Sequence, residues 1–321
     1  KMVTELILFL LGLYMLVKSS NLIVKGSTSL AHKLGVSALV IGLTVVAFGT
    51  SLPELVVNIF AAINNNPDLI FGNIIGSNIA NILLVLGISA IVGTVTIRYT
   101  TVWKTIPFAL VSSFILFILV SKVFIGDFEG PYLTRINALI LLALFGMFIY
   151  SVLEMIKNEK SKVPLLKPEK DDNYKIALKL LLGIVGIFIG AKLVLEGVIN
   201  LSRIFGISEF LISATAIALG TSLPELAVSI NAVLKGKVDL AVGNIIGSNI
   251  FNILWVLGIA ALIRPIKIPD FILFDISVMF FATLLLFVFI FVRKKHQLTR
   301  KSGIVFVILY LLYISFILIR G

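Results

Sequence analysis

The sequence contains no cysteine, and charged residues make up only 13% of it. Disulfide bonds and thiolate metal sites are therefore excluded. Histidine is scarce, because only His32 and His296 are present, and both lie among basic loop residues, where a solvated role is simplest. The chain is instead 59% hydrophobic, in runs long enough to span a bilayer. This composition predicts a protein that crosses the membrane many times.

A membrane span needs about 20 apolar residues, so 321 residues with short connections hold about ten spans. The predicted spans lie near residues 3–30, 37–63, 69–94, 103–123 and 134–156, and then near 176–201, 208–234, 240–263, 270–292 and 303–319. Lys and Arg outnumber Asp and Glu by 27 to 16, which in a soluble protein would suggest nucleic acid. Here the excess lies in loops, so it indicates orientation in a lipid bilayer and no nucleic-acid partner.

The basic residues also predict how the chain is oriented. Connections after the odd-numbered spans carry most of the Lys and Arg residues, and the opposite side carries few. The positive-inside rule then predicts a multi-pass cell-membrane protein with both termini extracellular and the 157–175 linker cytoplasmic. The apolar run at 6–17 resembles a secretion signal, but it belongs to a unit that recurs from Leu182 onward, so we expect a retained first span.

Two motifs each occur twice along the chain. Residues 47–58 read AFGTSLPELVVN and residues 218–229 read ALGTSLPELAVS, while 72–87 and 243–258 both begin with GNIIGSN. The copies are 171 positions apart, so the chain is an internal duplication. An odd number of spans per copy inverts the second copy in the membrane. The predicted fold class is an all-α polytopic membrane protein of ten transmembrane helices, arranged as two inverted five-helix repeats at 1–156 and 176–321.

The first motif places a carboxylate beside a helix break. Pro53 has no amide hydrogen and crowds the carbonyl of Gly49, so the helix is interrupted one turn before Glu54 and backbone oxygens near 47–49 are freed. Thr50 and Ser51 lie four and three residues before Glu54 and share its helix face. The counterparts in the second copy are Thr221, Ser222, Pro224 and Glu225. For one glutamate the alternatives are pairing with a buried lysine or a protonated, hydrogen-bonded carboxyl group. Two equivalent glutamates beside two helix breaks favour cation ligands.

The second motif supplies neutral oxygens. Asn73, Ser77 and Asn81 recur at intervals of four and form one polar helix stripe, repeated by Asn244, Ser248 and Asn252. Alone, such a stripe with small residues favours helix packing; beside the first motif it favours ion binding. Every donor in the combined set is oxygen, which suits hard cations such as Ca²⁺. Two glutamates match one Ca²⁺ or a pair of monovalent ions, so the two kinds of ion compete for one site.

The doubled GTSLPE and GNIIGSN motifs closely resemble the two alpha-repeats of the calcium/cation antiporter superfamily, and the chain is similar to prokaryotic or archaeal Na⁺/Ca²⁺ exchangers. The resemblance covers nearly the full length. It implies an ion core of spans 2, 3, 7 and 8, across which the first and sixth helices slide. It also implies Ca²⁺ ligation by Glu54 and Glu225. The implied contributors to flanking Na⁺ sites are Thr50, Ser51, Ser77, Thr221, Ser222 and Ser248, with the backbone oxygens of Ala47 and Ala218.

Two differences within the superfamily bear on coupling. Proton-coupled relatives typically carry an acidic residue in or beside the positions of Ser77 and Ser248, and its absence here favours Na⁺ coupling. Potassium-dependent relatives carry Asp at the position of Asn252, whereas Asn81 and Asn252 are both neutral, which argues against K⁺ dependence and leaves the role of these two asparagines open.

The leading functional prediction is therefore Na⁺/Ca²⁺ antiport by alternating access, with Ca²⁺/H⁺ antiport as the alternative. An intramembrane enzyme is disfavoured because the motifs offer no nucleophile beyond hydroxyls and amides. A channel is disfavoured because inverted repeats with broken helices suit alternating access better than a pore. No cofactor is expected beyond the transported ions, and one chain holds both halves of the site, so we expect a functional monomer.

Overall fold

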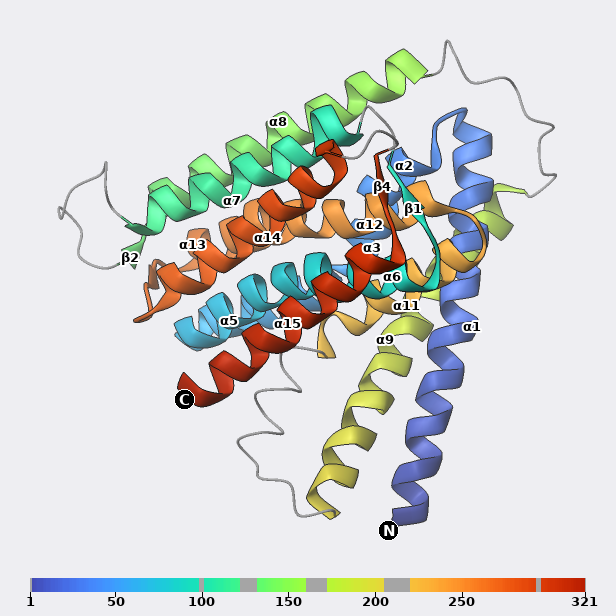
Figure 1. Cartoon of the computed structure of the whole chain (residues 1–321), viewed down its shortest axis with the longest axis horizontal. Helices are drawn as coiled ribbons and strands as arrows, with labels where there is room; N and C mark the ends of the chain where they lie inside the picture. Colours follow the sequence, from blue (N-terminus) through green and yellow to red (C-terminus); the bar gives the residue numbers. More distant parts are fainter. Residues whose placement is uncertain are drawn as a thin grey trace.

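The computed structural model describes residues 2–97, 101–121, 132–159, 172–204, 220–292 and 296–320, which are almost entirely helical (Figure 1). Eight helices among these residues are long and apolar enough to cross a membrane, and the bent pair Ala38–Thr50 and Leu52–Ile63 makes up to nine. The prediction of an all-helical, multi-pass membrane protein is thus confirmed. The predicted span at 208–234 begins outside the described residues, and its described part is the helix Leu223–Leu234.

The elements follow one another in a similar order in both halves. The first half contains α1 (Met2–Leu34), α2 (Ala38–Ile41), η1 (Gly42–Val46), α3 (Ala47–Thr50), α4 (Leu52–Ile63), α5 (Pro67–Ile79), η2 (Ala80–Val85), α6 (Leu86–Val92), β1 (Val95–Thr96), η3 (Thr101–Thr105), α7 (Ile106–Ser121), β2 (Tyr132–Leu133) and α8 (Arg135–Glu159). The second contains α9 (Asn173–Ile204), α11 (Leu223–Leu234), α12 (Val238–Ile250), η4 (Phe251–Val256), α13 (Leu257–Ile263), β3 (Ile266–Lys267), α14 (Ile272–Val292), β4 (Gln297–Leu298) and α15 (Arg300–Arg320).

The segments named η are π-helical turns, in which the helix is wider than an α-helix. Asn81 lies in η2, where α5 continues into α6, and Asn252 lies in η4, where α12 continues into α13. A π-turn inside an α-helix often marks a functional position, because it shifts the side chains that follow it around the helix axis. The two motif asparagines therefore occupy equivalent irregular turns in the middle of long helices.

The long helices of the second motif form the centre of the molecule. In Pro67–Val92 and Val238–Ile263, 78% and 83% of the apolar window is buried inside the protein, compared with 22% in Arg135–Lys157. Glycine permits the closest contact at this centre, because a Cβ added to Gly42 would lie 2.7 Å from the carbonyl oxygen of Leu240, and one added to Gly243 would lie 2.6 Å from that of Leu39. The central helices thus pack backbone against backbone.

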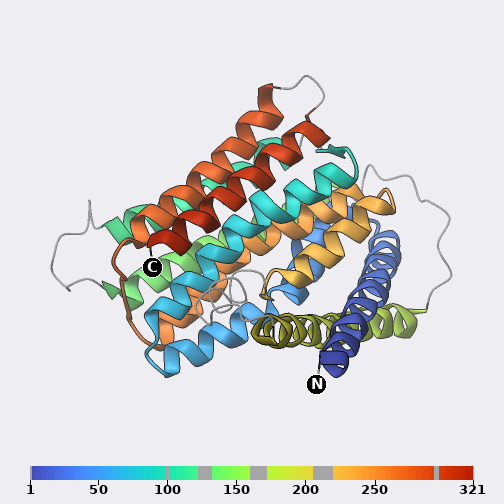
Figure 2. The same ribbon diagram turned by 60° about the horizontal axis from the view of Figure 1, so that its bottom comes forward.

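Helices α1 and α9 form a separate pair that lies side by side in both views (Figures 1 and 2). Glycine again sets their distance: a Cβ on Gly12 would lie 2.8 Å from the amide nitrogen of Val194, and one on Gly190 would lie 2.9 Å from that of Leu16. Small residues allow such close packing where no hydrophobic force distinguishes lipid from protein. These are the first helices of the two halves.

The halves are interleaved. Helix α6 of the first half packs against α15 of the second, and α13 of the second half packs against α8 of the first. Two short antiparallel pairings also join the halves, because β1 pairs with β4 through Val95 and Leu298, and β2 pairs with β3 through Tyr132 and Lys267. One core therefore contains elements from both copies of the duplication.

Candidate cation site

Both glutamates of the GTSLPE motif lie at the start of a helix that follows a break. Ser51, between α3 and α4, has φ −88° and ψ 4°, and Ser222, before α11, has φ −86° and ψ −3°. The first helical turns contain Pro53 and Pro224, as the sequence predicts. Glu54 and Glu225 are therefore close to helix N-termini, whose free amide groups and dipole favour negative charge.

The two carboxyl groups are buried and close to each other. Glu54 and Glu225 are both 0% exposed. They are near enough for the charge of Glu225 to act on Glu54. Two carboxylates buried in the same region repel, and burial removes the solvent that would screen them. This arrangement needs a positive charge, or a proton, between or beside the two groups.

Glu225 is connected to the first half by a chain of close polar contacts. Ser248 donates its hydroxyl to Oε1 of Glu225 at 3.2 Å, and its oxygen lies 3.3 Å from Oγ1 of Thr50. Thr50 donates to Oδ1 of Asn244 at 3.0 Å, and Nδ2 of Asn244 donates to the hydroxyl of Ser229 at 3.2 Å. Thr50, Ser248 and Glu225, predicted from separate motifs, thus meet at one place.

Glu54 has a different environment. Among the residues that the structure describes, neither of its carboxylate oxygens has a hydrogen-bond partner. Asn58, one turn further along α4, donates Nδ2 to the backbone oxygen of Glu54 at 2.6 Å rather than to its carboxylate. Ser77 donates to the backbone oxygen of Asn73 in its own helix. The Glu54 carboxylate is therefore fully available to a ligand.

Several other predicted residues also have buried side-chain oxygens without a hydrogen-bond partner in the described structure. Within the described part of the chain, the buried side-chain oxygens of the predicted set without a hydrogen-bond partner are Ser51 Oγ, Glu54 Oε1 and Oε2, Asn81 Oδ1, Thr221 Oγ1, Ser222 Oγ, Glu225 Oε2 and Asn252 Oδ1. A buried polar atom without a partner costs about 1–3 kcal/mol, so these oxygens are suited to ligating a cation. No group of three or more His, Cys, Asp or Glu side chains occurs in the described residues. A hard cation bound mainly by neutral oxygens fits this donor set.

One of the two predicted backbone ligands, Ala47, lies one turn before a helix break. The carbonyl oxygen of Ala47 accepts from the amide of Ser51 at 3.0 Å and lies 3.4 Å from Oγ1 of Thr50. The break therefore does not free this carbonyl, contrary to the expectation from Pro53, because the amide of Ser51 still bonds to it. Ala218, its counterpart, lies outside the described residues.

Sequence reasoning missed two asparagines that the structure places at the interface of the halves. Asn81 donates Nδ2 to Oδ1 of Asn249 at 3.0 Å, and Asn249 donates Nδ2 to the backbone oxygen of Asn78 at 3.2 Å. Asn78 and Asn249 are the final residues of the two GNIIGSN segments and are 171 positions apart. Their position in the duplicated motif was a usable signal, but the spacing of the polar stripe draws attention to other residues.

A cavity of about 740 Å³ reaches this region between α4, α5 and α9. Its lining includes Pro53, Pro224, Asn73 and Thr221. Lys192 also lines the cavity, and its ammonium group lies 3.8 Å from the carboxylate of Glu196 on the same helix. The cavity therefore borders both helix breaks.

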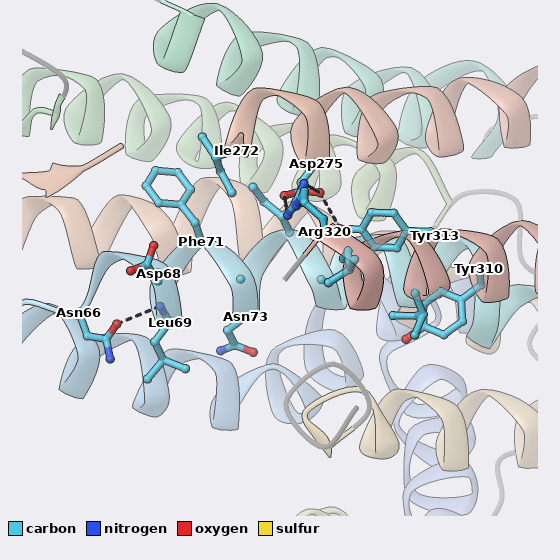
Figure 3. A pocket seen from close by; sticks show the side chains of 15 residues that line it. Asn66, Asp68, Leu69, Phe71, Asn73, Ile272, Asp275, Tyr310, Tyr313 and Arg320 are labelled. Carbon is cyan, nitrogen blue, oxygen red and sulfur yellow. Dashed lines mark hydrogen bonds and ion pairs between the residues drawn. The ribbon is translucent and has the colours of Figure 1, made fainter. Parts of the chain in front are cut away.

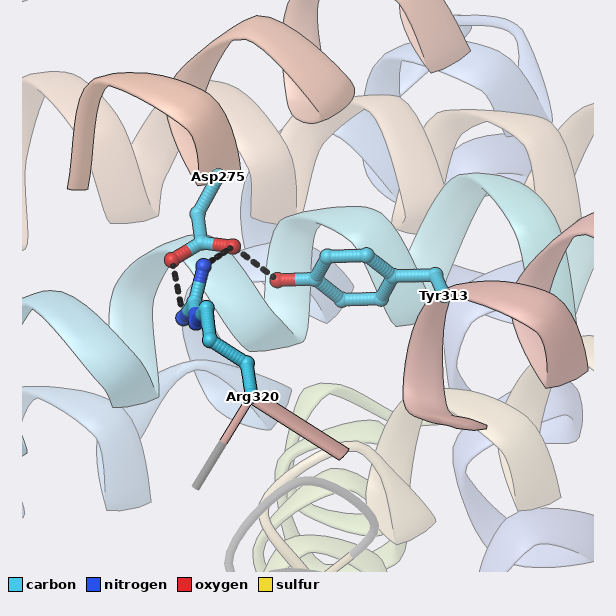
Figure 4. A network of polar contacts seen from close by, with 3 residues as sticks. All are labelled: Asp275, Tyr313 and Arg320. Carbon is cyan, nitrogen blue, oxygen red and sulfur yellow. Dashed lines mark hydrogen bonds and ion pairs between the residues drawn. The ribbon is translucent and has the colours of Figure 1, made fainter. Parts of the chain in front are cut away.

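A second cavity, of about 440 Å³, lies between α5, α14 and α15 (Figure 3). The carboxylate of Asp275 is satisfied there by three hydrogen bonds (Figure 4): from Arg320 Nη1 to Oδ1 at 3.2 Å, from Arg320 Nη2 to Oδ2 at 2.9 Å, and from the Tyr313 hydroxyl to Oδ1 at 3.2 Å. These bonds join α14 to α15. The charge of Asp275 is neutralised by Arg320, and in this respect Asp275 differs from Glu54 and Glu225 of the central site.

The chain is similar to known proteins along most of its length. The family profile described as sodium/calcium exchanger protein matches residues 4–153 and 175–319. The putative antiporter CaxA of Alkalimonas amylolytica is 38% identical over 82% of each chain, and the sodium/calcium exchanger MaX1 of Methanosarcina acetivorans is 30% identical over 96% of this chain and 97% of its own. The solved structure of the sodium-calcium exchanger NCX_Mj soaked with zero Na⁺ and Ca²⁺ has a TM-score of 0.81 and 31% identity, covering 99% of this chain and 100% of that chain.

These matches extend along nearly the whole chain and include both copies of the duplication. They confirm the resemblance inferred from the motifs and the expectation that the protein is not an enzyme. The chain belongs to the sodium/calcium exchanger protein family, whose members are membrane transporters.

Proposed function

We propose that this protein is a secondary antiporter that exchanges Na⁺ for Ca²⁺ across the membrane by alternating access. The observation that carries the proposal is the pair of fully buried glutamates, Glu54 and Glu225, whose charges act on each other, in motifs that also contain buried oxygens without partners in the described structure. Intramembrane carboxylates at broken helices are typical of ion sites in transporters built from repeats.

The proposed ion ligands are the residues predicted from the two motifs. Glu54 and Glu225 bind Ca²⁺, and the side chains of Thr50, Ser51, Ser77, Asn81, Thr221, Ser222, Ser248 and Asn252, with the backbone oxygens of Ala47 and Ala218, complete the Ca²⁺ and Na⁺ sites. Ca²⁺ takes six to eight oxygens in flexible geometry, so a set of two carboxylates and many neutral oxygens suits it.

Exchange follows from charge and from shared ligands. Two carboxylates are neutralised by one Ca²⁺ or by two Na⁺, and the same oxygens serve both ions, so one kind of ion must leave before the other binds. An unoccupied site leaves two buried charges uncompensated, which disfavours the movement of the empty protein between its two orientations. This coupling distinguishes an exchanger from a channel.

The proposed architecture places this site near the membrane midplane between two inverted five-helix repeats, 1–156 and 176–321, with ten spans in all. Both termini then face outward, and the 157–175 linker is cytoplasmic in a cell-membrane protein. Because one chain contributes both glutamates, the monomer is the functional unit. Helices α1 and α9 contact each other and the helices of the site. They are the elements that move relative to the site.

Na⁺ is the proposed coupling ion because no acidic residue lies in or next to Ser77 or Ser248. MaX1 and NCX_Mj, which align with nearly the full chain, are both named as sodium/calcium exchangers, and this supports the proposal. Ca²⁺/H⁺ antiport is the alternative, since two buried carboxyl groups also suit proton binding.

The test is ⁴⁵Ca²⁺ uptake into liposomes that contain the purified protein and are loaded with Na⁺. Dilution into Na⁺-free medium should drive uptake, whereas liposomes loaded with choline should take up little. Valinomycin with equal K⁺ on both sides holds the membrane potential at zero, so uptake then reports exchange.

Uptake that ignores the Na⁺ gradient but follows an imposed pH gradient would replace this proposal with Ca²⁺/H⁺ antiport. Uptake that proceeds equally in choline-loaded liposomes at constant pH would indicate a channel, because a channel needs no counter-ion.

A further inference from the structure

Asn81 and Asn252 occupy equivalent positions in the two halves, but only the amide of Asn81 has a hydrogen-bond partner in the described structure. Asn249 uses both ends of its amide, because Oδ1 accepts from Asn81 at 3.0 Å and Nδ2 donates to the backbone oxygen of Asn78 at 3.2 Å. All three asparagines are buried, with at most 2% of their surface exposed. This short relay crosses between equivalent positions of the two repeats.

The relay determines which way the Asn249 amide faces. A rotation by 180° would bring its oxygen against the carbonyl oxygen of Asn78 and its NH₂ group against the NH₂ group of Asn81. Both contacts would be repulsive, so the orientation in the structure is the one that satisfies both neighbours. The direction of the Asn81 amide is determined in turn, because its NH₂ group is held by Asn249.

Asn81 therefore presents its oxygen as the free end. In the described part of the chain, Oδ1 of Asn81 is buried without a hydrogen-bond partner. An amide oxygen is a good ligand for Na⁺ and Ca²⁺, while an amide nitrogen is not. The bond to Asn249 thus selects the end of Asn81 that can bind a cation.

The equivalent side chain in the first half does not do this for Asn252. Asn78 donates Nδ2 to the backbone oxygen of Ile74 in its own helix at 2.6 Å. Neither Nδ2 nor Oδ1 of Asn252 has a hydrogen-bond partner among the residues that are described. The amide of Asn252 is therefore not oriented by a neighbour, although it lies in the equivalent π-turn.

We propose that Asn249 is a positioning residue that holds Asn81 with its side-chain oxygen directed to the cation, and that Asn78 has no such role for Asn252. The proposal rests on the proposed function, because it assigns the ligand of Asn81 as a transported cation. It makes the site asymmetric: one amide ligand is oriented in advance, and the other must rotate when an ion binds. Partners that orient a metal ligand typically contribute about 10–100-fold to affinity.

The test measures ⁴⁵Ca²⁺ binding to the full-length protein in detergent without Na⁺. Asn249→Ala should weaken Ca²⁺ binding by about 10-fold. Asn78→Ala, the matched change at the equivalent position, should alter affinity by less than about twofold, because that side chain bonds only within its own helix.

A double-mutant cycle separates positioning from a general structural effect. If Asn249 acts through Asn81, then Asn249→Ala should cause no further loss of affinity in a protein that already carries Asn81→Ala. Should Asn249→Ala fail to fold, Asn249→Ser takes its place, since its shorter side chain cannot bridge Asn81 and Asn78 and should cause the same loss.

Four outcomes overturn the inference. Parental affinity in Asn249→Ala, or losses from Asn81→Ala and Asn249→Ala that multiply in the double variant, would remove the positioning role and leave the proposed function intact. An equal loss in Asn78→Ala would remove the asymmetry. Absence of Ca²⁺ binding by the parent protein would overturn the proposed function itself and this inference with it.

Discussion

Glu54 and Glu225 occupy the same position in two copies of the GTSLPE motif, but their hydrogen-bond partners differ. Oε1 of Glu225 accepts from Ser248, which lies at the end of a chain through Thr50, Asn244 and Ser229. Both carboxylate oxygens of Glu54 are without partners within the described residues. The carboxylate of Glu225 is thus partly bonded to the protein, whereas both carboxylate oxygens of Glu54 are available to a ligand.

A difference at one position helps to explain this. The residue one turn after the glutamate is Ser229 in the second half and Asn58 in the first. Ser229 accepts from Asn244 Nδ2, which leaves the oxygen of Asn244 to accept from Thr50. Asn58 instead donates to the backbone of its own helix, and neither end of the Asn73 amide has a partner in the described structure. Near-identical motifs therefore acquire different surroundings through one neighbour.

The largest expected effect comes from removing either charge. Glu54→Gln and Glu225→Gln should each reduce Na⁺-driven Ca²⁺ uptake by about 100-fold or more, because a direct charged ligand contributes at least as much as an orienting partner. The measurement is ⁴⁵Ca²⁺ flux in liposomes. Glu196→Gln is the matched control, since that exposed glutamate on α9 lies beside Lys192, and it should retain uptake. Full uptake in both of the buried variants would refute the site assignment.

The two threonines of the motifs provide a sharper test of the asymmetry. Thr50→Val should lower the free energy of unfolding without ions by about 2 kcal/mol, because Asn244 Oδ1 then remains buried without a donor. Thr221→Val removes a hydroxyl that has no partner among the described residues and should leave that free energy nearly unchanged. Both variants should weaken Ca²⁺ binding. Unfolding in detergent measures the difference, and equal destabilisation would break the comparison.

A smaller effect on stability is expected at Ser229, which lies at the far end of the chain from the Glu225 carboxylate. Ser229→Ala removes the acceptor for Asn244 Nδ2 and should destabilise the ion-free protein by about 1 kcal/mol. The midpoint of thermal unfolding reports this change. Ser315→Ala serves as control, because Ser315 is exposed and bonds only within its own helix. An unaltered midpoint in Ser229→Ala would show that the chain from Glu225 ends at Asn244.

The smallest effect on ion binding is expected at the second cavity. Tyr313→Phe removes one of three hydrogen bonds to Asp275 and should lower stability by about 0.5–1 kcal/mol. Ca²⁺ affinity should remain within about twofold of the parent protein, because Arg320 still neutralises Asp275. A change in the isotherm of ⁴⁵Ca²⁺ binding beyond about fivefold would instead place this cavity on the path of the ion.

Much of the fold was predictable because its signals are local or repeated. Apolar runs indicated the spans, and proline four residues after glycine indicated the break before each glutamate. The π-turns at Asn81 and Asn252 were not predictable, because an inserted residue in a helix leaves no clear mark on apolar periodicity. The ion pair between Asp275 and Arg320 was also missed, since it joins residues 45 positions apart that carry no shared motif.

The sequence by itself determined that this is a duplicated, multi-pass membrane protein and which residue types are available as ligands, because hydrophobicity, proline and repetition act along the chain. Only the tertiary structure decided which oxygens are paired and which are free. Hydrogen bonds such as those from Thr50 to Asn244 and from Asn81 to Asn249 join positions 194 and 168 residues apart. They depend on how helices of the two halves pack, so two nearly identical motifs become unequal parts of one site.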